Sequence, residues 1–101
     1  MKENEIIEVG LDPDGSLYVR PKAEDFSYIY RAAMGVKWDT DRGRLFFPKS
    51  SEWSYAKCFS QILLAAEDEY RVRLVLSPQT TWFVSTEIRS EIESRTQKGP
   101  P

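Results

Sequence analysis

The chain has 101 residues, the length of one small domain, and 41% of them are apolar, as in a folded globular protein. Its 14 basic and 16 acidic side chains give a net charge of −2, so the chain as a whole does not attract nucleic acid or an acidic membrane. It has no histidine and one cysteine, Cys58, which excludes an internal disulfide and the common zinc sites; we expect no metal and no cofactor.

The first two apolar segments predict a β-hairpin. Residues 5–11 and 16–20 are rich in β-favouring side chains, including Ile6, Val9 and Val19. Residues 12–15 between them read Asp-Pro-Asp-Gly. This sequence is typical of a tight turn, because proline fixes φ at the first central position and glycine accepts the tight backbone that follows.

Residues 25–34 are compatible with two structures. One is a short amphipathic helix that ends at Gly35, because apolar side chains recur at a spacing of three and four. They are Phe26, Ile29, Tyr30 and Ala33. The other is a strand, favoured by the β-prone side chains of residues 27–31. The sequence leaves the choice open, and we take the helix as the working prediction.

A second hairpin is predicted for residues 36–47. Residues 36–38 and 44–47 are rich in β-favouring side chains, and residues 39–43 read Asp-Thr-Asp-Arg-Gly. This linking sequence supplies turn formers and a glycine that can take a positive φ.

The longest periodic pattern predicts the main helix, from about Glu52 to Glu69. Pro48 ends the preceding hairpin, and Ser50 or Ser51 is expected to cap the helix. Its apolar stripe consists of Trp53, Tyr55, Ala56, Phe59, Ile62, Leu63, Ala66 and Tyr70. Cys58 lies at the margin of this stripe, where we expect it to pack, since no histidine or second cysteine is present to activate it.

The last third of the chain predicts two short strands and a helix. Residues 71–76 alternate charged and apolar side chains, as a half-buried strand does, and residues 81–84 form a further short strand. Ser85 is placed to cap a final helix, in which Glu91 can pair with Arg95. Residues 97–101 are expected to form a disordered tail, because they are polar and rich in proline.

This order of elements predicts an α+β fold in a single domain over residues 1–96. Two hairpins and a further strand are expected to form an antiparallel sheet, covered by a long central helix and one or two shorter helices. No apolar run approaches the roughly 20 residues of a membrane-spanning helix, and the charged N-terminus does not read as a secretory signal. We therefore expect a cytoplasmic protein with no membrane association.

One stretch of the chain resembles a known group of proteins. Residues 28–39 read Tyr-Ile-Tyr-Arg-Ala-Ala-Met-Gly-Val-Lys-Trp-Asp, followed by aromatic landmarks at residues 52–55 and 69–70. These motifs, across the middle two thirds of the chain, resemble small proteobacterial proteins of unknown function, some of which are carried as integron gene cassettes. The resemblance implies a compact α+β domain of a bacterial cytoplasm and leaves open whether the gene is carried on a mobile element. It transfers no catalytic or binding residues.

Charge and aromatic side chains are unevenly distributed. Residues 26–60 hold nine of the 13 aromatic residues and six basic against three acidic side chains, whereas residues 1–25 hold three basic against seven acidic ones. Basic groups among aromatic rings can stack bases and neutralise phosphates. A local excess of three positive charges is small beside the contacts that typical binders make, so nucleic acid is not the expected partner.

Thirteen aromatic rings are more than the core of a 101-residue domain needs. Tyrosine, tryptophan and arginine are the residues that anchor protein interfaces. We therefore expect a non-catalytic binding or protein-protein interaction domain that forms a homodimer through an aromatic-rich surface. The expected surface residues are Tyr28, Tyr30, Arg31, Trp38, Trp53, Tyr55 and Trp82.

The alternative is a small-molecule-binding protein or a carboxylate-based enzyme with an aromatic pocket. In that case Arg31 or Asp39 would orient the ligand, and Asp39 or Glu69 would act as acid or base. The sequence identifies no catalytic residue. It favours binding over catalysis.

Overall fold

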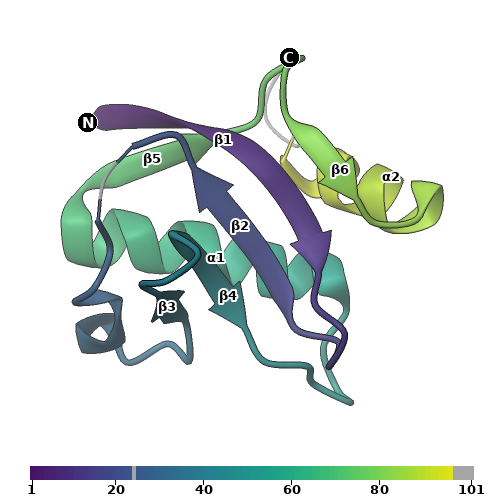
Figure 1. Cartoon of the computed structure of the whole chain (residues 1–101), viewed down its shortest axis with the longest axis horizontal. Coiled ribbons are helices and arrows are strands. Elements are labelled where there is room, and N and C mark those ends of the chain that lie inside the picture. The colour runs from purple at the N-terminus through teal and green to yellow at the C-terminus, as the bar shows by residue number, and fades with distance from the viewer. Residues whose placement is uncertain (24, 97–101) are drawn as a thin grey trace.

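The computed structural model describes residues 1–23 and 25–96. Figure 1 shows a sheet with the long helix α1 behind it, and α2 beside β6. The elements in chain order are β1 (Lys2–Leu11), β2 (Leu17–Pro21), the 3₁₀ helix η1 (Ile29–Ala32), β3 (Lys37–Asp39), β4 (Arg44–Phe47), α1 (Tyr55–Tyr70), β5 (Val72–Val75), β6 (Thr81–Phe83) and α2 (Thr86–Thr96). The α+β fold predicted from the sequence is confirmed.

The six-stranded sheet has the order β3-β4-β2-β1-β5, and β6 also pairs with β1. Both predicted hairpins are present and antiparallel, β1 with β2 and β3 with β4. The expectation of a wholly antiparallel sheet is corrected, because β5 and β6 both run parallel to β1. The reason lies in α1, which carries the chain back along the sheet after β4, as the crossover between two parallel strands must.

Strands β5 and β6 occupy successive lengths of one edge of β1. Residues 72–75 pair with the start of β1 and residues 81–83 with its end. The interruption coincides with a bulge in β1 between Ile6 and Glu8. There the Thr80 hydroxyl donates a hydrogen bond of 2.6 Å to the carbonyl of Ile6. This buried bond holds the connection between β5 and β6 against β1.

Residues 25–34 form neither the short amphipathic helix nor the strand considered above. Only one 3₁₀ turn, η1, is present, and Ala33 ends it in the left-handed conformation, with φ 56°. Phe26 and Ile29 are buried, but Tyr30 points outward. Two buried side chains suffice to hold one turn against α1, whereas a longer helix needs a continuous apolar face.

Helix α1 begins three residues later than predicted and uses a different cap. The hydroxyl of Ser54 accepts a hydrogen bond of 3.1 Å from the N–H of Lys57. Ser50 instead accepts N–H bonds from Glu52 and Trp53, in the turn that precedes the helix. The chain from Ser50 to Trp53 is therefore a turn before the first helical residue, Tyr55.

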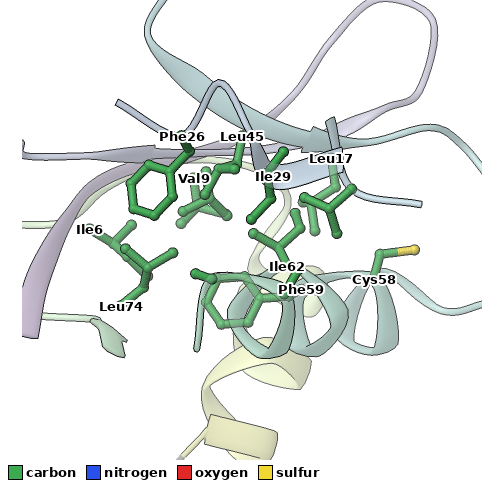
Figure 2. Packing of buried hydrophobic residues seen from close by; sticks show 14 of the residues in the cluster. Ile6, Val9, Leu17, Phe26, Ile29, Leu45, Cys58, Phe59, Ile62 and Leu74 are labelled. Atoms are coloured by element: carbon green, nitrogen blue, oxygen red, sulfur yellow. The ribbon is translucent and has the colours of Figure 1, made fainter. Parts of the chain in front are cut away.

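The core lies between the sheet and α1, and Figure 2 shows its side chains meeting from the two layers. Its largest fully buried members include Phe26, Phe59, Ile6, Leu17, Ile29, Leu45 and Ile62. Cys58 is buried as expected, and this burial raises the pKa of its thiol, so it remains protonated at neutral pH. Within the described part of the chain, no helix is long and apolar enough to cross a membrane.

Helix α2 begins as predicted, since the hydroxyl of Ser85 accepts the N–H of Ile88 at 3.2 Å. The carboxylate of Glu91 accepts a bond of 3.4 Å from the N–H of Ala56, which ties α2 to the first turn of α1. Arg89 and Glu93 form an ion pair within α2, at 3.3 Å. The tail predicted for residues 97–101 lies outside the described residues.

The capping assignment leads to a direct test. Replacing Ser54 with alanine removes the acceptor for the N–H of Lys57, and we expect the free energy of unfolding to fall by about 1 kcal/mol. Ser51→Ala, at an exposed position, should change it by less than about 0.5 kcal/mol. Urea unfolding of both variants measures the difference. A larger loss in Ser51→Ala would mean that the helix is capped where the sequence alone suggested.

Candidate functional site

The seven residues expected to form a surface do not lie together. The structure brings three of them side by side on or next to η1: Tyr28, Tyr30 and Arg31. The two tyrosine rings have centroids 6.3 Å apart, and the guanidinium carbon of Arg31 lies 4.7 Å from the centre of the Tyr28 ring. The side chains of Tyr28 and Tyr30 are 53% and 64% exposed. We call these three residues the η1 cluster.

Trp38 and Trp82 lie in different places. Trp38, on β3, is half-buried against Phe26, with ring centroids 5.7 Å apart. Trp82, on β6, is half-buried beneath Arg89, whose guanidinium carbon lies 5.0 Å from the ring centre. Both rings pack against the core. They contribute to the packing of β3 and β6 more than to an exposed surface.

Trp53 and Tyr55 hold the start of α1 in place. The ring of Trp53 stacks on Phe47 at 5.2 Å with an angle of 14° between the planes. The hydroxyl of Tyr55 donates a hydrogen bond of 3.0 Å to the carbonyl of Gly15, in the turn of the first hairpin. These two side chains connect α1 with β4 and with the hairpin turn.

One exposed ring was absent from the expected set. Phe83, at the end of β6, is 59% exposed. Side chains alternate between the faces of a strand, so the inward position of Trp82 places Phe83 on the opposite side. The alternation within residues 81–83 is the signal that identifies it.

The face of the sheet opposite α1 carries a network of polar side chains. Tyr18 on β2 lies over Gly10 on β1, where a Cβ atom would collide with the phenol ring. Its hydroxyl donates a hydrogen bond of 2.5 Å to the carboxylate of Glu8. The guanidinium of Arg44 lies 3.8 Å above the Tyr18 ring and pairs with Asp12. Tyr18 is consequently only 6% exposed, on a face over which the described residues place no helix.

The charges in this network balance. Arg20 lies 3.7 Å from Glu8, and Arg44 pairs with Asp12, so each cation has an acidic partner. Burial and the neighbouring Glu8 raise the pKa of Tyr18 to about 12. At neutral pH the phenol is therefore protonated and acts as a hydrogen-bond donor. The network closes the open face of the sheet.

A groove runs between α1, β5 and α2, with a volume of about 600 Å³. The described residues that line it are Leu63, Glu67, Arg73, Leu74, Val75, Leu76, Ser77, Pro78, Arg89 and Glu93. None of these is aromatic, and neither Asp39 nor Glu69 is among them. Asp39 instead accepts the N–H of Arg42 at 3.1 Å, within the turn of the second hairpin. The residues of the described chain also form no cluster of three His, Cys, Asp or Glu side chains able to hold a metal ion.

The fold and these surfaces define a small α+β domain built on a mixed sheet, one face of which is covered by helices. The family model described as "Integron Cassette Protein Hfx_Cass5" matches residues 4–80. The chain therefore belongs to this family of integron cassette proteins, and the resemblance found in the sequence is confirmed.

A solved structure supports this assignment. It is described as an integron cassette protein, Hfx_Cass5, from the mobile metagenome of the North West Arm sewage outfall. It is 39% identical in sequence, the match covers 93% of this chain and 95% of that one, and the TM-score is 0.50. No curated protein matches the chain.

The raised pKa of Tyr18 predicts a specific pH dependence. The ordinary pKa of tyrosine is 10.0, and in the folded protein that of Tyr18 is about 12. Between these values the unfolded state binds fewer protons than the folded state, so the free energy of unfolding falls as the pH rises. In Tyr18→Phe, which has no phenol hydroxyl at this position, the contribution of Tyr18 to this decrease in the free energy of unfolding should be absent. The variant should also be less stable by about 1 kcal/mol below pH 10, because the bond to Glu8 is missing.

Urea unfolding across this pH range measures the effect. The control is Tyr30→Phe, which removes the hydroxyl of an exposed ring and should keep the wild-type dependence on pH. If the free energy of unfolding changed equally with pH in the wild type and in Tyr18→Phe, the network would not raise the pKa of Tyr18.

Proposed function

We propose that the protein is a non-catalytic protein-protein interaction domain that forms a homodimer through the η1 cluster. The observation that carries this proposal is the exposure of Tyr28 and Tyr30, two neighbouring rings that are each more than half accessible in the single chain. Exposed tyrosines beside an arginine have the composition of an interface hot spot.

The η1 cluster sits on an anchored segment. The hydroxyl of Tyr70, at the end of α1, accepts a hydrogen bond of 2.7 Å from the N–H of Tyr28. Ile29 is 1% exposed, and the side-chain amide of Gln61 donates a bond of 3.2 Å to the carbonyl of Met34. A segment held in this way loses little conformational entropy on binding, which favours affinity.

A second copy of the chain is the partner that this chemistry fits. In a symmetric dimer the same patch meets itself, so it must contain complementary groups. Tyr30 offers a ring face on which the partner's Arg31 can lie, and the exposed carboxylate of Asp25 is close in sequence to balance the two guanidinium groups. A small core, as in a 101-residue chain, also gains from the apolar area that a dimer buries.

The same proposal places the protein in the bacterial cytoplasm, where a free thiol such as that of Cys58 stays reduced.

The alternative of an aromatic ligand pocket or a carboxylate enzyme has less support. The groove between α1, β5 and α2 is lined by aliphatic and charged side chains, and Asp39 is engaged in a hairpin turn.

The proposal is tested by the mass of the protein in solution. Sedimentation equilibrium should give about twice 11.7 kDa for the wild type. The double variant Tyr28→Ser and Tyr30→Ser should dissociate, with a Kd raised about a thousandfold or more, because the two anchors each contribute about 2 kcal/mol or more.

The matched control is Phe83→Ser, which removes an equally exposed ring on β6, away from η1. It should leave the mass unchanged. A wild type that sediments as a single chain at every concentration would disprove the dimer, and dissociation by Phe83→Ser alone would place the interface on β6.

A further inference from the structure

We propose that the groove between α1, β5 and α2 binds an extended peptide segment of another protein, which adds as a strand to the free edge of β5. This site is separate from the η1 cluster, and it does not depend on the proposed dimer. Four observations support it: the position of β5 in the sheet, the way the groove follows this strand, its apolar floor, and the ion pairs at its rim.

Strand β5 is the outermost strand on its side of the sheet. It pairs with β1 on one side, and the described residues place no strand on the other. Figure 1 shows it at the edge of the sheet, above α1. An edge strand presents backbone N–H and C=O groups that are free to pair with an added strand. Its four residues offer about 13 Å of such an edge.

The groove follows this edge. Three consecutive residues of β5, 73–75, line it together with the three residues that follow the strand, 76–78. Because the side chains of a strand alternate between its faces, a hollow that borders three consecutive strand residues lies along the edge of the strand and not on one face. The opposite wall is formed by residues of α1 and α2, so the groove lies between a strand edge and two helices. Addition of a strand at such a place is a common mode of peptide recognition.

The floor of the groove suits an aliphatic side chain. Leu63 on α1 and Leu76 after β5 are partly buried and pack against the core, so their exposed parts form an apolar seat. A volume of about 600 Å³ lies within the range of sites that enclose a ligand. The peptide that fits best has aliphatic side chains at alternate positions, one of which enters this seat.

A weak ion pair belongs to the lining of the groove. Val72 and Leu74 face the core, so Arg73 starts on the open face of the sheet, yet its Nε lies 4.0 Å from the carboxylate of Glu67 on α1. Its side chain must therefore pass around the free edge of β5, since β1 occupies the other edge. Both partners are substantially exposed, at 54% and 39%, and a pair of this kind contributes little to stability. It shields the edge and can open when a strand is added.

The second ion pair lies on the opposite wall, where Arg89 and Glu93 of α2 are 3.3 Å apart. The groove thus offers two positive and two negative groups: Arg73 on the strand side, and Glu67, Arg89 and Glu93 on the helix side. These groups can exchange their partners for charged side chains of either sign that flank the aliphatic centre of a peptide.

The test uses a short capped peptide of alternating valine and threonine, titrated to millimolar concentration into the full chain. Amide chemical shifts of residues 73–76 in NMR spectra should change and saturate. A second peptide has the same sequence but carries N-methyl groups on alternate residues, which removes its backbone donors and keeps its side chains. It should not bind, because strand addition needs those donors.

Two protein variants test whether the peptide binds in the groove. Leu63→Lys puts a charge on the apolar seat and should weaken binding about tenfold or more. Leu64→Lys makes the same substitution one residue along the helix, at an exposed position outside the lining of the groove, and should bind within about twofold of the wild type.

Three results would overturn the proposal. The first is an absence of saturable shifts with the unmodified peptide. The second is equal binding of the N-methylated peptide, which would indicate an apolar pocket and not a strand edge. The third is a concentration-dependent shift of residues 73–76 without any peptide, which would mean that a second copy of the chain occupies the edge. The N-methylated peptide tests the proposal even if Leu63→Lys fails to fold.

Discussion

The packing of one long helix against one face of the sheet is the constraint on which the rest of this structure depends. Phe59 and Ile62 of α1 are fully buried against the strands, and the core is a single layer between the two (Figure 2). Among the described residues α1 is the longer of two α-helices, and no helix of residues 1–23 and 25–96 covers the opposite face of the sheet.

The open face is closed by its own side chains. Tyr18 can lie flat because Gly10 has no Cβ, and Arg44 then stacks on the ring while Asp12 holds the guanidinium. The network replaces an apolar layer by a hydrogen bond, a cation–π contact and two ion pairs. Its groups are held in place mutually, which explains why burial raises the pKa of Tyr18 on a face without a helix.

The same arrangement determines where partners can bind. With one face covered and the other closed, the remaining places are the edges and the connections. The η1 cluster lies on the connection between β2 and β3, and the peptide groove lies along the free edge of β5. Both sites combine a rigid support with groups that are unused in the single chain: tyrosine rings in the first, backbone edge groups in the second.

The sequence by itself determined the elements whose signals are local. The two hairpins, α1 and the Ser85 cap were predictable, because turn residues, apolar spacing and capping side chains act within a few residues. The sequence predicted one surface that contained Tyr28, Tyr30 and Arg31 together with Trp38, Trp53, Tyr55 and Trp82. It could not tell the exposed rings of Tyr28 and Tyr30 from the half-buried rings of Trp38 and Trp82, since a ring has the same composition in both places. Only the tertiary structure decided the direction of β5 and β6, the reduction of residues 25–34 to one turn, and the joining of Gly10, Tyr18 and Arg44. These depend on contacts between residues far apart in the chain, which no local pattern records.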